Sequence, residues 1–215
     1  MDSLFCDELI LYNQELQKFD ARGNIIFFKN NQKMESDELK YITLDSLNNI
    51  SIQLLGNVHI YDSLRVIKGD TLFLDYKDSL IKKIIVKNNA KINNSRFAKV
   101  DLESDLQIFD DIFESKKIII VFEDDVVKYI EMGGMSNAKL YAIKDNIING
   151  FNTLSGDSIL IYLKNDSVDF LSVIGGARGL FYPEKNNSDI EFNIKFNANH
   201  IDYDMKNEKS YLIDN

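Results

Sequence analysis

The acidic residues of this sequence that could perform catalysis occur as adjacent pairs, whose side chains are not expected to meet at one substrate. Asp110-Asp111 and Asp124-Asp125 are adjacent carboxylates, and paired carboxylates can serve general acid–base catalysis. Adjacent residues of a β-strand point to opposite faces, so neither pair would place both carboxylates on one substrate. We therefore predict no catalytic residue and no enzymatic activity.

Histidine and cysteine do not form a metal-binding pattern. The two histidines, His59 and His200, lie far apart in the sequence, and each fits a surface histidine better than a metal ligand. Cys6 is the single cysteine, which rules out an intrachain disulfide and a Cys-based metal site. We predict no metal and no cofactor.

Glycine-rich segments provide no catalytic loop. Ser155-Gly156-Asp157-Ser158 lacks the G-x-S-x-G pattern of a nucleophile elbow and a nearby histidine. Gly133-Gly134 and Gly175-Gly176 lack the strand-to-helix context of a phosphate-binding loop. We interpret both glycine pairs as bulges or turns.

Composition predicts a folded, strand-rich chain with an acidic surface. Of the 215 residues, 45% are hydrophobic and 11% aromatic, with one proline and no tryptophan, which favours β-structure with a real core. The net charge of -9 leaves no basic footprint for nucleic acid. No apolar run reaches the length of about 18 residues that spans a membrane. No basic and apolar leader precedes Cys6, so we expect either a cytoplasmic protein or a mature, trimmed chain.

Alternating apolar residues predict the elements that would position any site. The segments Gly69–Ile92 and Gly156–Phe181 share one layout: Gly-Asp, an alternating run, a polar turn and a second alternating run. In the first segment the turn is expected at residues 77–79, and Asn88-Asn89 is expected to end the return strand. Lys164 to Ser167 is the corresponding turn of the second segment.

Weaker copies of the same layout begin at Cys6, Ser36, Ser115 and Asn197. One hairpin is marginal in water, so about six such units must stack to bury their apolar faces. We predict one all-β domain of stacked hairpins over residues 1–215. The acidic segment from Ala98 to Lys117 departs from the layout, and we expect a short amphipathic helix or an irregular insert near residues 101–114.

Several of these motifs resemble the OstA-like, or LptA, family. Gly56-Asn57-Val58, the run from Gly69 to Tyr76 and Gly23-Asn24-Ile25 are similar to its Gly-Asn-Val strand starts and D-x-L-x-Y runs. The resemblance covers most of the chain outside the acidic segment, and that segment and the pI of 4.8 depart from the family. The resemblance implies an open, V-shaped β-jellyroll in which two sheets of stacked hairpins enclose an apolar groove.

The resemblance also implies a function, which is periplasmic transport of lipopolysaccharide with the acyl chains of lipid A shielded in the groove. The expected groove residues are Val58, Ile60, Leu72, Leu74, Tyr76, Ile84, Val86, Ile118, Ile120, Ile159 and Ile161. Stacked hairpins leave edge strands, expected here in the hairpins Leu9–Phe28 and Ile190–Leu212. Edge strands recruit further strands, and in the family they join β-jellyroll proteins head to tail between the inner and outer membranes.

Two other classes remain open at this point. A structural β-solenoid or bactofilin-like filament former would have a fully packed interior, although its units should be nearly constant in length. A carbohydrate-active β-helix enzyme would need carboxylates that converge on one face. The resemblance does not distinguish an LptA-like protein from an LptC-like protein or from an LptD N-terminal part.

Overall fold

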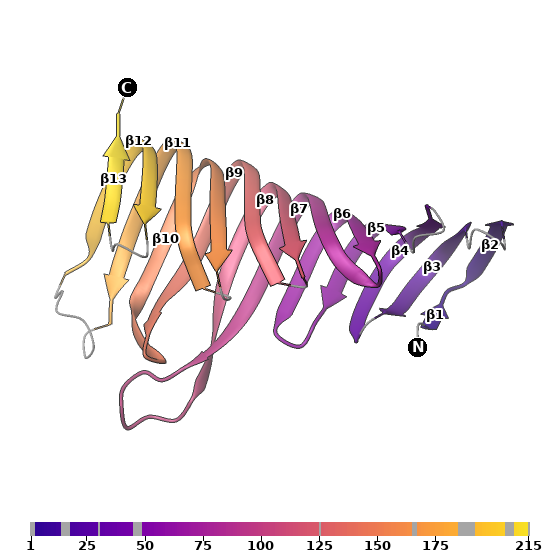
Figure 1. Ribbon diagram of the computed structural model, residues 1–215, viewed down its shortest axis with the longest axis horizontal. Helices are drawn as coiled ribbons and strands as arrows, with labels where there is room; N and C mark the ends of the chain where they lie inside the picture. The colour runs from indigo at the N-terminus through magenta and orange to yellow at the C-terminus, as the bar shows by residue number, and fades with distance from the viewer. Residues whose placement is uncertain are drawn as a thin grey trace.

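The computed structural model describes residues 3–13, 18–29, 31–44, 49–124, 126–164, 167–184, 192–204 and 209–214. These residues form thirteen strands and no helix (Figure 1). The strands are β1 (Ser3–Phe5), β2 (Glu8–Asn13), β3 (Lys18–Lys29), β4 (Gln32–Thr43), β5 (Ile50–Tyr61), β6 (Arg65–Lys77), β7 (Leu80–Ala98), β8 (Gln107–Glu123), β9 (Val126–Lys144), β10 (Ile147–Lys164), β11 (Ser167–Pro183), β12 (Ile194–Asp204) and β13 (Lys209–Ile213).

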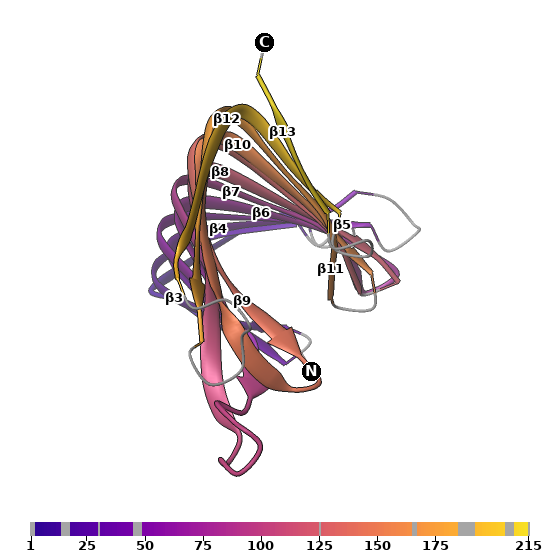
Figure 2. The same ribbon diagram turned by 90° about the vertical axis from the view of Figure 1, so that its left-hand side faces the viewer.

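The strands build one antiparallel sheet in which sequence neighbours are also spatial neighbours. The order runs from β1 through β3 and onward to β13, and β2 pairs with β3 beside β1. The sheet does not close on itself, and its long strands bend so that the molecule has a curved, open cross-section (Figure 2). The prediction of an all-β fold of open, stacked hairpins is confirmed.

The tight turns follow the expected chemistry where the structure describes them. β6 ends at Lys77 and β7 begins at Leu80, and the two residues between them, Asp78 and Ser79, have φ of 52° and 65°. Two positive φ angles define the turn type whose twist matches an antiparallel hairpin. The turn expected at residues 164–167 includes residues that lie outside the described part.

The helix expected near residues 101–114 is wrong, and the alternative of an irregular insert holds for part of that segment. Residues 99–106 form a bent loop, and residues 107–114 already belong to β8. Asp101 and Ser104 hold the loop through hydrogen bonds to backbone N–H groups, such as Ser104 N to Asp101 Oδ1 at 2.8 Å. Asp and Ser side chains that bond nearby backbone groups compete with helix formation.

The described part of the chain contains no helix that is long and apolar enough to cross a membrane.

A second correction concerns the Gly-Asn and Gly-Asp pairs, which were expected at strand starts. Gly23-Asn24, Gly56-Asn57 and Gly69-Asp70 lie in the middle of β3, β5 and β6, and Asn88-Asn89 lies inside β7 rather than at its end. Gly23-Asn24, Gly56-Asn57 and Asn88-Asn89 are extra residues at shifts in strand register and have positive φ, so each is a β-bulge. Gly69-Asp70 lies opposite two of these bulges, on the strand between them. Bulges bend a strand and increase its twist, and here they bend strands without ending them.

Candidate lipid-binding interior

The bulges of neighbouring strands form one line across the sheet, which we call the crease. Gly and Asn residues with positive φ alternate along it with carboxylates on the next strand. The amides of Asn24, Asn57 and Asn89 donate to Asp7, Asp37 and Asp70 at 2.9, 3.1 and 3.1 Å. The same contact recurs at three places along the crease, and register shifts continue the crease through the later strand pairs to β11 and β12.

The interpretation of the two glycine pairs as bulges or turns is confirmed. Gly175-Gly176 lies where the β11–β12 register shifts, and both residues have positive φ. Gly133-Gly134 lies at the register shift between β8 and β9. Both pairs therefore belong to the crease.

The crease divides the sheet into two arms. Arm A contains β2, β13 and the part of each long strand that lies on their side of the crease, such as residues 71–77 of β6. Arm B contains β1 and the part of each long strand on the other side, such as residues 65–69 of β6. Leu, Ile and Val side chains of both arms face one shared interior, in which they form a single buried cluster.

An unbroken apolar row crosses arm A from one end of the sheet to the other. Successive cross-strand partners in this row are Leu9, Ala21, Leu39, Leu54, Leu72, Val86, Ile118, Met132, Ile159, Val173, Ile201 and Leu212. The ten inner members have no exposed surface, whereas the outermost two, Leu9 and Leu212, are 49% and 51% exposed. The interior is therefore covered along its length and reaches solvent at its ends.

The structure brings the eleven expected groove residues together on the inner faces. Val58 and Ile60 lie in arm B, and the other nine lie in arm A. All eleven are at most 2% exposed, so they contact protein and not solvent. Whether they contact lipid stays a prediction.

Close packing at the crease explains why the interior is filled. A Cβ atom added at Gly69 would lie 2.5 Å from Val86 Cγ1, and one at Gly156 would lie 2.7 Å from Val173 Cγ1. Val86 and Val173 belong to the arm A row, so the two arms meet tightly where they join. An apolar ligand would have to displace these contacts or enter farther from the crease.

Inner-face residues of the terminal strands are the accessible part of the interior, and they were not among the expected groove residues. Leu9 and Leu11 of β2 are 49% and 57% exposed, and Leu212 of β13 is 51% exposed. Leu9 and Leu212 pair with the buried residues Ala21 and Ile201, and Leu11 pairs with the partly buried Phe19, so all three lie on the inner face. The alternation of apolar residues in the terminal hairpins could have identified these leucines as inner-face residues.

Both ends of the sheet present strand backbone, as expected for edge strands. β1 pairs only with residues 26–28 of β3, and β13 pairs only with residues 200–204 of β12. Within the described residues, the arm B half of β12 has no strand on its outer side. The expected edge at Leu9 lies in β2, whereas Ile190 lies outside the described residues.

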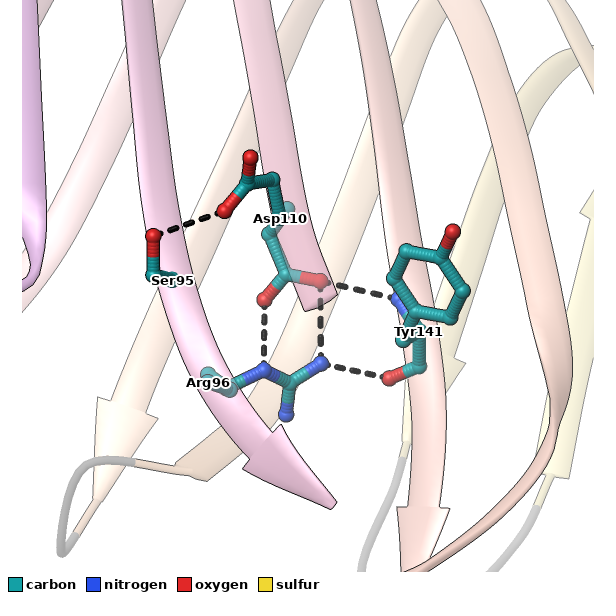
Figure 3. Close-up of polar contacts among 5 residues, drawn as sticks. Ser95, Arg96, Asp110 and Tyr141 are labelled. Carbon is teal, nitrogen blue, oxygen red and sulfur yellow. Dashed lines mark hydrogen bonds and ion pairs between the residues drawn. The ribbon is translucent and has the colours of Figure 1, made fainter. Parts of the chain in front are cut away.

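Asp111 enters a buried polar cluster at the far margin of arm B (Figure 3). Arg96 approaches both carboxylate oxygens, at 2.7 and 2.9 Å, and donates to the Tyr141 carbonyl at 2.6 Å. The Tyr141 N–H donates to Asp111 Oδ1 at 2.9 Å. Burial raises the pKa of the Asp111 carboxyl, and the Arg96 charge opposes that rise.

This cluster makes hydrogen bonds to the β9 backbone at a position where the pairing of β8 with β9 has ended. The β8–β9 ladder stops at Ile112 and Lys139, and beyond these residues β7 and β8 continue as a hairpin that is not paired with β9. In the loop after β7, Lys99 forms an isolated bridge with Ile147 of β10. The Asp111 and Arg96 side chains thus satisfy the Tyr141 backbone that β8 no longer reaches. Asp110 bonds Ser95 instead, at 2.7 Å, so the two adjacent carboxylates make separate contacts.

The other candidate chemical groups also have local partners. His200 Nε2 lies 2.7 Å from Asp202 Oδ1 and 2.9 Å from Ser172 Oγ. His59 Nδ1 lies 2.9 Å from the Asn57 carbonyl. The histidines thus take part in separate contacts on different strands. Of the other pair of adjacent carboxylates, Asp124 lies in the β8–β9 turn, and Asp125 lies outside the described residues.

Comparison with known proteins finds a similarity among solved structures but none among family models or curated sequences. No protein-family model matches the sequence, and no curated protein sequence matches it. Among solved structures, the chain is similar to LptH, the LptA homologous periplasmic component of the conserved lipopolysaccharide transport device from Pseudomonas aeruginosa. The similarity covers 62% of this chain and 82% of that chain, with a TM-score of 0.43 and 14% sequence identity.

Proposed function

We propose that this protein is a periplasmic carrier that shields the acyl chains of lipopolysaccharide between the two arms of its sheet. The observation that carries the proposal is the apolar row of arm A, which runs without a polar interruption to an exposed leucine at each end. The sequence motifs similar to the OstA-like family support the same function. The proposal includes no enzymatic step and no cofactor.

Acyl burial supplies the driving force for such a carrier. Each CH2 group moved from water to an apolar environment contributes about 0.8 kcal/mol, so a fourteen-carbon chain contributes on the order of 10 kcal/mol. The phosphates of lipid A would stay in solvent, where repulsion from the acidic protein is about 1 kcal/mol per close pair and is screened by salt. The acyl term therefore outweighs the charge term.

The filled interior defines how the ligand enters. Because the central groove residues are at most 2% exposed, acyl chains would first contact the exposed inner-face leucines at an end of the sheet. Deeper insertion requires the arms to separate. The sheet is not closed, so its arms can move apart without breaking backbone hydrogen bonds between strands.

The same filled interior favours a second candidate function. A sheet whose core is packed by its own side chains and whose two ends carry edge strands is suited to a structural protein that assembles end to end. In that case the exposed leucines would be covered by a second copy of the chain and not by lipid.

Two neighbouring residues of β13 provide a matched test of the lipid proposal. Leu212 and Tyr211 are 51% and 50% exposed, and they point to opposite faces because Leu212 pairs with Ile201 and Tyr211 with Asp202. A photo-crosslinking amino acid is placed at one position or the other, and each variant is irradiated with purified lipopolysaccharide. We expect saturable labelling from position 212 and background labelling from position 211.

The outcomes separate the two candidate functions. Equal labelling at both positions, or none at position 212, contradicts the lipid proposal. Protein–protein crosslinks from position 212, formed without lipid and increasing with protein concentration, would favour the structural protein.

A further inference from the structure

Cationic side chains gather on the solvent face of arm B, although the protein as a whole has a net charge of -9. Two adjoining depressions lie there, with volumes of about 410 and 450 Å³, and both are lined by Glu114 and Asn137. The cations that line them are Lys91, Lys116, Lys139, Arg178 and Lys195.

Strand register places these side chains on the face opposite the apolar interior. Lys139 lies between the buried residues Ala138 and Leu140 of β9, so its side chain points away from the interior. Lys139 pairs with Thr153, and the same row continues through β11 to Lys195 of β12. The depressions therefore lie outside the proposed lipid path.

Among the described residues that line this surface, cations outnumber acids. Glu114 is the single acidic residue that lines the depressions, and it forms an ion pair with Lys91 at 2.6 Å. Within the described residues, no acidic partner lies within ion-pair distance of Arg178 or Lys195, and both are exposed. A local positive field on an otherwise acidic protein attracts anions.

The uncharged groups of the same surface suit sugar hydroxyls. Asn137, Thr153 and Ser155 supply amide and hydroxyl groups along the floor, and such groups donate and accept hydrogen bonds. Two residues farther along the strands, the rings of Tyr141, Phe151 and Tyr182 form a row with centroid separations of 5.7 and 4.6 Å. Lys139 Nζ lies 4.7 Å from the first two ring centroids.

We propose that this surface, from Lys116 at the crease to Lys195 on β12, is a binding site for a polyanionic saccharide chain. Two joined depressions offer a length that a single inorganic anion does not fill. The mixture of separated cations, hydroxyl and amide groups and flanking aromatic rings matches a chain of sugars that carries repeated negative groups.

The test compares two charge-matched double variants. Arg178→Gln/Lys195→Gln removes two exposed cations from this surface, whereas Lys40→Gln/Lys77→Gln removes two exposed cations from arm A. The probe is a short oligogalacturonate, a carboxylated sugar chain, and its binding is measured by calorimetry at low and high salt. Uncharged maltohexaose, inorganic tripolyphosphate and a single-stranded oligonucleotide are the comparison ligands.

We expect oligogalacturonate to bind the natural chain and the arm A variant equally, and to bind the Arg178/Lys195 variant at least tenfold more weakly. Binding should weaken with salt, because exposed charges are screened beyond about 10 Å at 0.1 M ionic strength. Tripolyphosphate and maltohexaose should bind at least tenfold more weakly than oligogalacturonate.

Other results overturn the proposal. Equal loss in both double variants would indicate a general charge effect, and equally tight tripolyphosphate would indicate a simple anion site. Tighter binding of the oligonucleotide would assign the surface to nucleic acid. Unchanged far-UV circular dichroism and thermal unfolding establish that the variants are folded. Acyl binding plays no part in this test, so its result is independent of the lipid proposal.

Discussion

At the scale of single residues, a few backbone positions determine the bend of the whole sheet. Gly56 has a φ of 73°, and an added Cβ atom there would collide with the Asp37 carboxylate. The next residue, Asn57, has a φ of 46° and donates to the same carboxylate. Glycine is needed at the first position because it adopts positive φ without strain and, having no Cβ atom, leaves room for the Asp37 side chain.

We predict that Gly56→Ala lowers the free energy of unfolding by about 1–3 kcal/mol, through backbone strain and the collision with Asp37. The matched control is Gly133→Ala, because a Cβ atom there meets nothing within 4 Å, and its effect should stay within about 0.5 kcal/mol. Urea unfolding of the two variants measures the difference. Equal effects would show that Gly56 is not a constraint on the crease.

Tyr203 provides a pH-dependent prediction. Burial raises the pKa of its hydroxyl from 10.0 to about 12. The neutral form is therefore favoured in the folded state, and the stability it contributes is present below pH 10 and is lost as the pH rises from about 10 to about 12.

Removing the Tyr203 hydroxyl should remove that loss. Between pH 10 and 12 the natural chain should lose on the order of 1 kcal/mol more stability than Tyr203→Phe, after allowance for partial solvent screening. Chemical unfolding of both proteins across this pH range measures the effect. Parallel curves would contradict a raised pKa at this site.

At the scale of elements, the β7–β8 hairpin depends on side chains where the sheet ladder fails. Beyond Ile112 the β8 backbone no longer pairs with β9, and Asp111 with Arg96 bonds the Tyr141 backbone instead. Removing one member of a buried ion pair leaves the other charge and its backbone partner unsatisfied.

We predict that Asp111→Ala costs about 2–4 kcal/mol of stability and detaches the hairpin from β9. Asp110→Ala removes a hydrogen bond to Ser95 from the adjacent position and should cost about 1 kcal/mol. Hydrogen exchange at Tyr141 N–H distinguishes local from general destabilisation. Selective loss of protection there is expected in the Asp111 variant, and unchanged protection would contradict the role of Asp111.

At the scale of the whole molecule, an open sheet leaves two terminal edges that closed barrels lack. Leu212 and Ile213 of the last strand are 51% and 42% exposed. Exposed apolar edge strands recruit other strands, so we predict concentration-dependent end-to-end association.

The variant Leu212→Lys/Ile213→Lys should shift the protein toward monomer, since charged edge residues oppose strand pairing. Leu64→Lys/Met135→Lys changes two residues that are 42% and 66% exposed elsewhere and should leave association unchanged. Sedimentation velocity over a range of concentrations measures both. Association that persists in the edge variant would place the contact on another surface.

The alternation of apolar residues was sufficient to predict the fold class and the inner faces. Leu72, Leu74 and Tyr76 were expected on one face, and all three are buried together. The same pattern could not locate strand ends, because a glycine pair can end a strand or bulge within it. The helix expected near residues 101–114 failed because its apolar spacing fits a strand equally well once Asp101 and Ser104 have bent the loop before it.

The sequence by itself determined that successive antiparallel strands stack with their apolar residues on one side, because a period of two leaves no other way to bury them. Only the tertiary structure decided where that apolar side is accessible, because neighbouring strands cover it along the sheet and leave it exposed at the two ends. It also decided that cations from β7, β8, β9, β11 and β12 share one surface, because residues far apart in the chain become neighbours only when bulges and strand register align them.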